Sequence, residues 1–245
     1  MSTKSELVHK LQQDILMWQG FKPASAACAE RIGLGAIEDA FPGGMFPKRA
    51  IHEFITVFPE DAAASDGFIA GLLAALMRDG AACIWISTAR RLFPAALSSF
   101  NVAPERIIFM DVDTEKDALW IMEEALRCEG LAAVVAEVDA LSLVESRRLQ
   151  LAVEESGVTG FILRKDARRM ASTIATARWQ ISPLPSVLEE GMPGLGFPRW
   201  QVNLLKVRNG VPGSWIMEWA GEGFLEVKRV LQQDGWRTGE NRQIG

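Results

Sequence analysis

Residues 50–87 read AIHEFITVFPEDAAASDGFIAGLLAALMRDGAACIWIS, and this stretch decides the fold. Its apolar spacing predicts a strand over 50–55, a helix over 67–78 and a nearly all-apolar strand over 81–87. A strand, a helix and a second buried strand in this order are typical of a right-handed crossover in a parallel sheet. We therefore expect an α/β fold with helices flanking a central sheet.

Residues 56–66, TVFPEDAAASD, form the expected loop between the first strand and the helix. A nucleotide-binding fold carries its phosphate loop at this position, with glycines whose N–H groups close on the phosphates, a lysine, and a Ser or Thr for Mg²⁺. The segment contains neither glycine nor lysine, and Glu60, Asp61 and Asp66 would repel a polyanion. The sequence therefore favours a function in binding rather than in catalysis.

Strands and helices alternate through the next part of the chain, and the pattern then changes after residue 177. The further predicted strands cover 106–111, 131–138, 159–163, 177–182, 199–207 and 214–219, and the further predicted helices cover 115–127 and 142–155. Ser142 and Glu145 have the spacing of a capping box at the start of the second of these helices. The turn-rich residues 208–213 predict a late antiparallel β-hairpin beside the mostly parallel sheet.

The chain begins with an amphipathic segment. Apolar side chains recur at helical spacing over residues 5–18, and four of them define a candidate partner-docking face: Leu7, Leu11, Ile15 and Trp18. Docking on a partner chain and packing on the protein's own core both remain open. We expect an N-terminal helix over 1–22, a core domain over 30–222 and a mobile tail over 223–245.

The composition narrows the classes of function. The chain has 245 residues, 49% of them apolar, with a net charge of −5, which argues against a general binder of polyanions. Three separated cysteines and two histidines predict neither a zinc site nor a disulfide framework. No stretch approaches the roughly 20 apolar residues that span a bilayer. We expect a cytoplasmic protein without a membrane anchor, cofactor or metal.

Four cations follow the fifth predicted strand closely: Arg164, Lys165, Arg168 and Arg169. They are candidates for contact with single-stranded DNA or with a partner, since each neutralised phosphate would add to affinity and to its dependence on salt. An ordinary solvated run of charges explains the same residues equally well.

Four segments in a fixed order carry a resemblance to a known family. They are FPGGMFP at 41–47 with IHE at 51–53, KDALWIMEEALR at 116–127, SRRLQLA at 146–152, and GFPRW at 196–200 through PGSW at 212–215. The chain resembles the RecA core and, more closely, the ImuA family of RecA/SulA-like accessory proteins of bacterial error-prone repair. The resemblance covers most of residues 32–219, and it implies a RecA-like core.

Compared with a working RecA ATPase, the chain departs where the chemistry lies. The resemblance places Ser65 near the phosphate-loop lysine and Asp66 near the Mg²⁺-binding hydroxyl. It places Ala89 near the acid that activates water and Ala136 near the Walker B aspartate. Because phosphoryl transfer depends on all of these parts, we expect no ATP hydrolysis and no enzyme activity.

Two acids at the end of the Walker B-like strand keep a residual nucleotide site open. Glu137 and Asp139 could hold a metal if the register shifted by one residue. We favour the alternative that both cap the strand end in solvent, because no lysine accompanies them.

The resemblance implies a non-catalytic adaptor in DNA-damage-induced mutagenesis, that is, in translesion synthesis during the SOS response. Its implied partners are an ImuB-like protein related to polymerases, RecA and an error-prone DNA polymerase, while self-association stays open. The N-terminal helix and the C-terminal tail are the expected docking elements. Two rival hypotheses are a SulA-like inhibitor of cell division that binds FtsZ and an ATPase with an unorthodox phosphate site.

Overall fold

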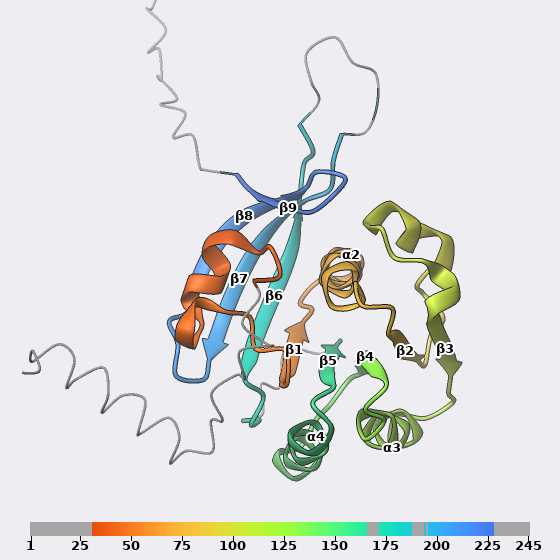
Figure 1. The fold of residues 1–245 in the computed structure, drawn as a ribbon. Coiled ribbons are helices and arrows are strands. Elements are labelled where there is room, and N and C mark those ends of the chain that lie inside the picture. Colours follow the sequence, from red (N-terminus) through yellow and green to blue (C-terminus); the bar gives the residue numbers. More distant parts are fainter. Residues whose placement is uncertain (1–30, 166–171, 188–193, 195, 228–245) are drawn as a thin grey trace, which may run out of the picture.

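The computed structural model describes residues 31–165, 172–187, 194 and 196–227. Within this part the strands form one nine-stranded mixed sheet in the order β3-β2-β4-β5-β1-β6-β7-β8-β9 (Figure 1). Helix α2 covers one face of its parallel half, and α3 and α4 cover the other (Figure 1). The predicted RecA-like α/β class is therefore confirmed, while the predicted N-terminal amphipathic helix lies outside the described residues.

The parallel half of the sheet matches the predicted strands closely. Its members are β1 Ile51–Ile55, β2 Ala82–Ser87, β3 Ile107–Asp111, β4 Leu131–Val138 and β5 Thr159–Arg164. The central strand β4 supplies side chains to two apolar layers: Ala133 and Val135 join the α2 layer, while Val134 and Ala136 join the α3 and α4 layer. Burial on both faces explains its continuous apolar sequence.

In the described part of the chain, three α-helices pack on this sheet. They are α2 Pro59–Leu76, α3 Glu115–Leu126 and α4 Leu143–Ser156. The Thr114 hydroxyl accepts a hydrogen bond from the Asp117 N–H at the start of α3, and Ser142 and Glu145 form the predicted capping box of α4. Gly157 ends α4 with a φ of 81°. None of the helices described has the length and apolar character needed to cross a membrane.

The start of α2 differs from the prediction. The expected loop over 56–66 is wrong, because the helix begins at Pro59 and only residues 56–58 connect it to β1. Proline is favoured in the first turn of a helix, and the alanines at 62–64 are strong helix formers. The local propensity of this segment therefore prevails over the loop that a nucleotide-binding fold would need.

Short 3₁₀ segments complete the connections. They are η2 Gly35–Ala40, η3 Pro42–Gly44, η4 Pro94–Phe100 and η5 Pro104–Arg106. Among them η2 contacts β8 and β9, and η4 contacts α2. Segments η2 and η4 contribute Ile37, Ala40 and Leu97 to the apolar layer under α2.

Strand β6 is the point where the sheet changes from parallel to antiparallel. It covers Ala177–Leu184, pairs in parallel with β1 and pairs in antiparallel fashion with β7, Arg199–Val207. Strand β8, Gly213–Trp219, then returns along β7. The predicted late hairpin is confirmed.

The sheet continues past the domain boundary expected at residue 222. Strand β9, Phe224–Glu226, pairs with β8, and its Phe224 ring lies 4.8 Å from the Phe68 ring centroid and 5.2 Å from that of Trp219. A Cβ at Gly71 would come within 2.5 Å of the Phe224 ring, so α2 needs a glycine there. The rest of the predicted tail, 228–245, lies outside the described residues.

An aromatic cluster under α2 holds a fully buried histidine. The Nε2 atom of His52 lies 2.8 Å from the Pro47 carbonyl oxygen, and the Trp179 indole N–H donates to His52 Nδ1 over 3.3 Å. These partners assign the proton of the neutral ring to Nε2. The Phe46 ring stacks on the imidazole with centroids 4.4 Å apart. Burial lowers the pKa of His52 to about 4, against a smaller opposing effect of the Pro47 carbonyl.

Candidate functional site at the carboxyl edge of the sheet

An acid of the protein itself closes the turn between β1 and α2. The Asp61 carboxylate accepts hydrogen bonds from the backbone N–H groups of Val57 and Phe58, each over 3.2 Å, and its side chain is buried. Backbone N–H groups at a strand–helix junction are the groups that hold phosphate in nucleotide-binding folds. In this chain a carboxylate fills that anion position from within.

The two residues expected at the phosphate-loop chemistry lie elsewhere. Ser65 and Asp66 sit about two turns inside α2 rather than at its start, because the helix begins at Pro59. The predicted placement of both residues is therefore wrong. The buried Ser65 hydroxyl has no hydrogen-bond partner in the described part of the chain.

Glu137 is the centre of a buried polar cluster. Its Oε2 atom lies 3.4 Å from Lys165 Nζ and 3.6 Å from an Arg91 guanidinium nitrogen, and the Trp85 indole N–H lies 3.4 Å from Oε1. The side chain is only 2% exposed. The expectation that Glu137 caps the strand in solvent is wrong, because its place on β4 directs it to the α2 face together with Trp85. A lysine from the neighbouring strand end accompanies this acid after all.

The charges of this cluster also act on Asp66 of α2. Burial, and secondarily the negative charge of Glu137, raise the pKa of Asp66 to about 7, while Arg91 and Lys165 oppose the shift. Two acids and two cations from four segments of the chain thus form one partly buried charge cluster. The arrangement can hold a proton on Asp66 close to neutral pH.

Replacing Asp66 with asparagine is expected to increase stability at pH 8 by about 1–2 kcal/mol, after allowance for the partial exposure of the side chain. In the unfolded chain Asp66 ionises near pH 4, whereas in the folded chain it ionises near pH 7. The native state binds the extra proton in between, so the wild type loses stability relative to the variant as the pH rises from 4 to 7. Urea unfolding at pH 4.5, 6 and 8 measures this. A stability difference independent of pH would contradict the assignment.

The other positions singled out near the Walker B strand behave differently. Asp139 is exposed, as expected, and its backbone N–H donates to Glu115 Oε1 over 3.2 Å. Ala136 is buried in the α3 and α4 layer, and Ala89 is exposed. Among the described residues, no group of three or more His, Cys, Asp or Glu side chains is arranged to hold a metal ion.

Arg164 does not fit its predicted role in contacting DNA or a partner. Its side chain is 2% exposed, and its guanidinium donates to Glu53 Oε1 over 3.0 Å. The other carboxylate oxygen of Glu53 accepts from the Thr173 hydroxyl and from Arg178, each over 2.8 Å. Arg164 is therefore an internal partner of a buried acid, and its expected external contact is wrong.

The remaining predicted contacts are only partly described. Lys165 is 24% exposed and donates to the Thr88 hydroxyl over 3.1 Å. Together with Glu137, it therefore already has two partners at the carboxyl edge of the sheet. The other candidates lie outside the described residues: Arg168, Arg169, Leu7, Leu11, Ile15 and Trp18.

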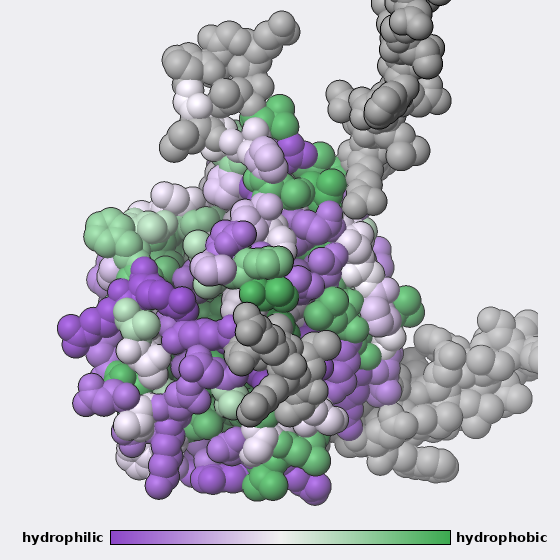
Figure 2. All heavy atoms as spheres, turned by 180° about the vertical axis from the view of Figure 1, so that it is seen from behind, coloured by the Kyte–Doolittle hydropathy of each residue, from purple (hydrophilic) through white to green (hydrophobic). Residues whose placement is uncertain are grey.

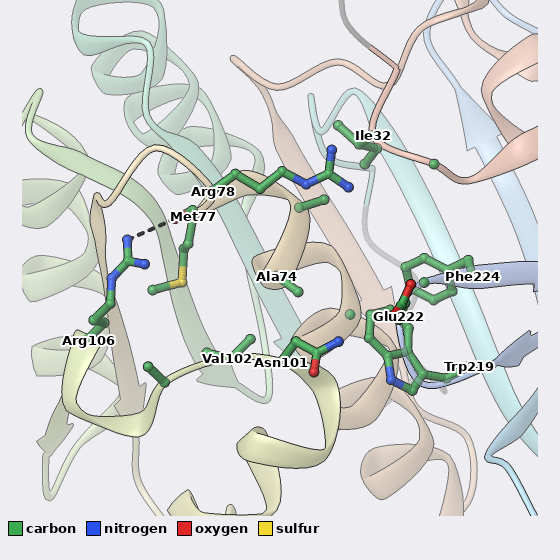
Figure 3. A pocket seen from close by; sticks show the side chains of 15 residues that line it. Ile32, Ala74, Met77, Arg78, Asn101, Val102, Arg106, Trp219, Glu222 and Phe224 are labelled. Carbon is green, nitrogen blue, oxygen red and sulfur yellow. Dashed lines mark hydrogen bonds between the residues drawn. The ribbon is translucent and has the colours of Figure 1, made fainter.

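A separate cavity of about 480 Å³ lies at the end of α2 (Figure 3). The Arg106 guanidinium points to the backbone there and donates to the carbonyl oxygens of Met77 and Ala81 over 2.8 and 2.6 Å. Trp219 and Phe224 form the opposite side (Figure 3). Internal carbonyls engage the guanidinium of Arg106, which lines the cavity together with Arg78, and we assign no ligand to this cavity.

Comparison with known proteins places this geometry in a family context. The chain is 35% identical over 230 residues to Protein ImuA from two strains of Caulobacter vibrioides, an alignment that covers 87% of this chain and 94% of those proteins. The crystal structure of the RadB recombinase superposes with a TM-score of 0.55 and 14% identity over 78% of this chain and 96% of RadB. This likeness shows the fold alone. No protein-family model matches the chain.

Proposed function

Because this chain belongs to the ImuA family, we propose that it is a RecA-like adaptor without catalytic activity in bacterial error-prone DNA repair. In this role it binds an ImuB-like protein, and through it or beside it RecA and an error-prone polymerase, during translesion synthesis in the cytoplasm. A fold shared with a recombinase does not by itself establish a function. The proposal therefore rests on the family together with the chemistry at the carboxyl edge.

The position of Asp61 at the turn between β1 and α2 is the observation that supports the proposed absence of catalytic activity. Asp61 engages the N–H groups of residues 57 and 58, and Lys165 and Arg91 engage Glu137. Phosphoryl transfer needs free donors and a metal around a terminal phosphate. Internal partners that occupy these groups favour a scaffold that is stable without nucleotide.

Exposed apolar side chains at the same edge support protein binding. Phe58 is 59% exposed beside β1, Phe93 is 70% exposed after β2, and Leu143 and Val144 are exposed at the start of α4. Figure 2 shows that hydrophobic side chains on one face lie in separate groups among hydrophilic ones. Exposed aromatic and aliphatic side chains are typical anchors of protein interfaces.

Capture of the tagged full-length protein from DNA-damaged native cells tests the adaptor role. We expect an ImuB-like protein to be recovered, and we expect Phe58→Asp to reduce its recovery about tenfold or more, as for loss of an interface anchor. Val211→Asp is the matched control, because Val211 is 70% exposed in the turn between β7 and β8, away from the carboxyl edge.

Three outcomes would contradict the proposal. Recovery of FtsZ alone would favour the SulA-like division inhibitor. Equal losses with Phe58→Asp and Val211→Asp would remove the carboxyl edge as the docking surface. Binding of Mg-ATP by the purified protein at micromolar concentration would contradict the non-catalytic part.

A further inference from the structure

A groove with a cationic lining runs along α4 on the face of the sheet opposite α2. Its volume is about 440 Å³, and it lies between α4 and residues 173–175, with the end of β7 beside them. Arg147, Gln150, Leu151 and Glu154 line one wall at helical spacing, so they share one face of α4. The opposite wall presents Lys206 and Arg208.

Hydrogen bonds hold the two walls in place. The Ser146 hydroxyl accepts from the Ile174 N–H over 3.3 Å and donates to the Leu143 carbonyl over 2.9 Å. Lys206 Nζ donates to the Thr173 carbonyl over 2.7 Å. The groove is therefore preformed, and a ligand would meet positioned side chains rather than a collapsed surface.

Two of the cations that line the groove form no ion pair with a described residue. Within the described residues, neither Arg147 nor Lys206 forms a salt bridge. Burial, and then the neighbouring Arg178 and Arg208, lower the pKa of Lys206, against an opposing effect of Glu53. A bound anion would relieve this repulsion between like charges.

The groove also contains an unsatisfied hydrogen-bond acceptor. Gln150 is 7% exposed, its Nε2 donates to Glu154 Oε1 over 3.1 Å, and its Oε1 has no partner among the described residues. The Glu154 carboxylate, which can only accept, fixes this orientation of the amide. Because this oxygen is itself buried, a ligand satisfies it with an N–H or O–H donor only where the Gln150 amide turns toward the groove.

We propose that this groove binds an extended acidic peptide segment of a partner protein, with carboxylates on Arg147 and Lys206 and a backbone N–H on Gln150 Oε1. A peptide supplies both groups at close spacing, and the exposed Leu151 suits an apolar neighbour. The wall from Arg147 to Glu154 is about 10 Å long, which about three extended residues span. A phosphodiester backbone brings no hydrogen-bond donor for Gln150.

The groove begins one helical turn after Leu143 and Val144, and its test is independent of the identity of any partner. The probe is a fluorescein-labelled peptide of about eight residues with alternating Glu and Leu, measured by anisotropy with the full-length protein at low salt. Arg147→Gln is expected to weaken binding about tenfold, as for loss of a charge-assisted hydrogen bond. Arg148→Gln is the matched control, because Arg148 pairs with Glu123 and is not part of the groove.

Each alternative result overturns the proposal. Absence of peptide binding, or equal weakening by Arg147→Gln and Arg148→Gln, would reduce the groove to general surface charge. Equal affinity for a peptide with Gln in place of Glu would remove the role of the carboxylates. Binding of single-stranded oligo(dT) that depends on Arg147, without binding of the acidic peptide, would assign the groove to nucleic acid.

Discussion

Replacing Glu53 with glutamine is expected to lower the free energy of unfolding by about 3–5 kcal/mol. Glu53 is fully buried on β1 and accepts hydrogen bonds from Arg164, Arg178 and Thr173. Glutamine keeps the size of the side chain but loses its charge and one acceptor oxygen. Two cations, one of them 2% exposed, would then lose the negative charge of Glu53 in a region with little access to solvent.

Urea unfolding followed by the fluorescence of the eight tryptophans measures this loss. The matched control is Asp111→Asn, which removes the same charge from an exposed pair with Arg90 and should cost about 1 kcal/mol or less. A similar small loss for both variants would show that the Glu53 network contributes no more than a surface pair. A change in m-value would instead indicate an altered native or unfolded state.

Acidification is expected to remove about 3 kcal/mol of stability through His52 alone, as the pH falls from 6.5 to 4. The unfolded chain protonates this histidine near pH 6.5, whereas the folded chain keeps it neutral until about pH 4. Below pH 6.5 the unfolded state therefore binds more protons and is favoured. The aromatic ring on one side and the indole N–H on the other leave no acceptor for a second imidazole proton.

The variant His52→Gln isolates this effect from that of the carboxylates. A glutamine can donate to the Pro47 carbonyl and accept from Trp179 as the imidazole does, although it loses the stacking on Phe46. We expect the variant to be less stable at pH 7 but to lose less stability on acidification. Equal losses in both proteins between pH 6.5 and 4 would contradict the role of His52. Asp66 acts in the opposite direction, so it cannot mimic this result.

The sequence alone predicted most of the elements of the fold, because their signals are local. Strand β7 begins and ends where its alternating pattern does, and the capping box of α4 and the glycine at 157 mark that helix in the sequence. The predicted start of α2 was wrong, because we expected residues 59–66 to belong to the loop of a nucleotide-binding fold, whereas they form helix.

The candidate site was predicted less well, because it depends on strand order. Glu137 lies near the end of β4, and Lys165 directly follows β5. The order of strands along the chain does not show which strands pair. Because β4 and β5 are neighbours in the sheet, these two side chains meet. The only signal in the sequence was that both residues stand at strand ends. The same limit applies to the groove, whose walls come from α4 and from the end of β7.

The sequence by itself determined the α/β alternation, the caps and the absence of lysine and glycine from residues 56–66, since these follow from neighbours along the chain. The tertiary structure alone decided which charges are buried. Arg164 has the sequence context of a surface cation, but the sheet places Glu53, 111 positions away, beside it. A charge can be buried only where it has partners, and the sheet brings these partners from distant segments of the chain. The spacing of residues near Arg164 in the sequence therefore does not indicate them.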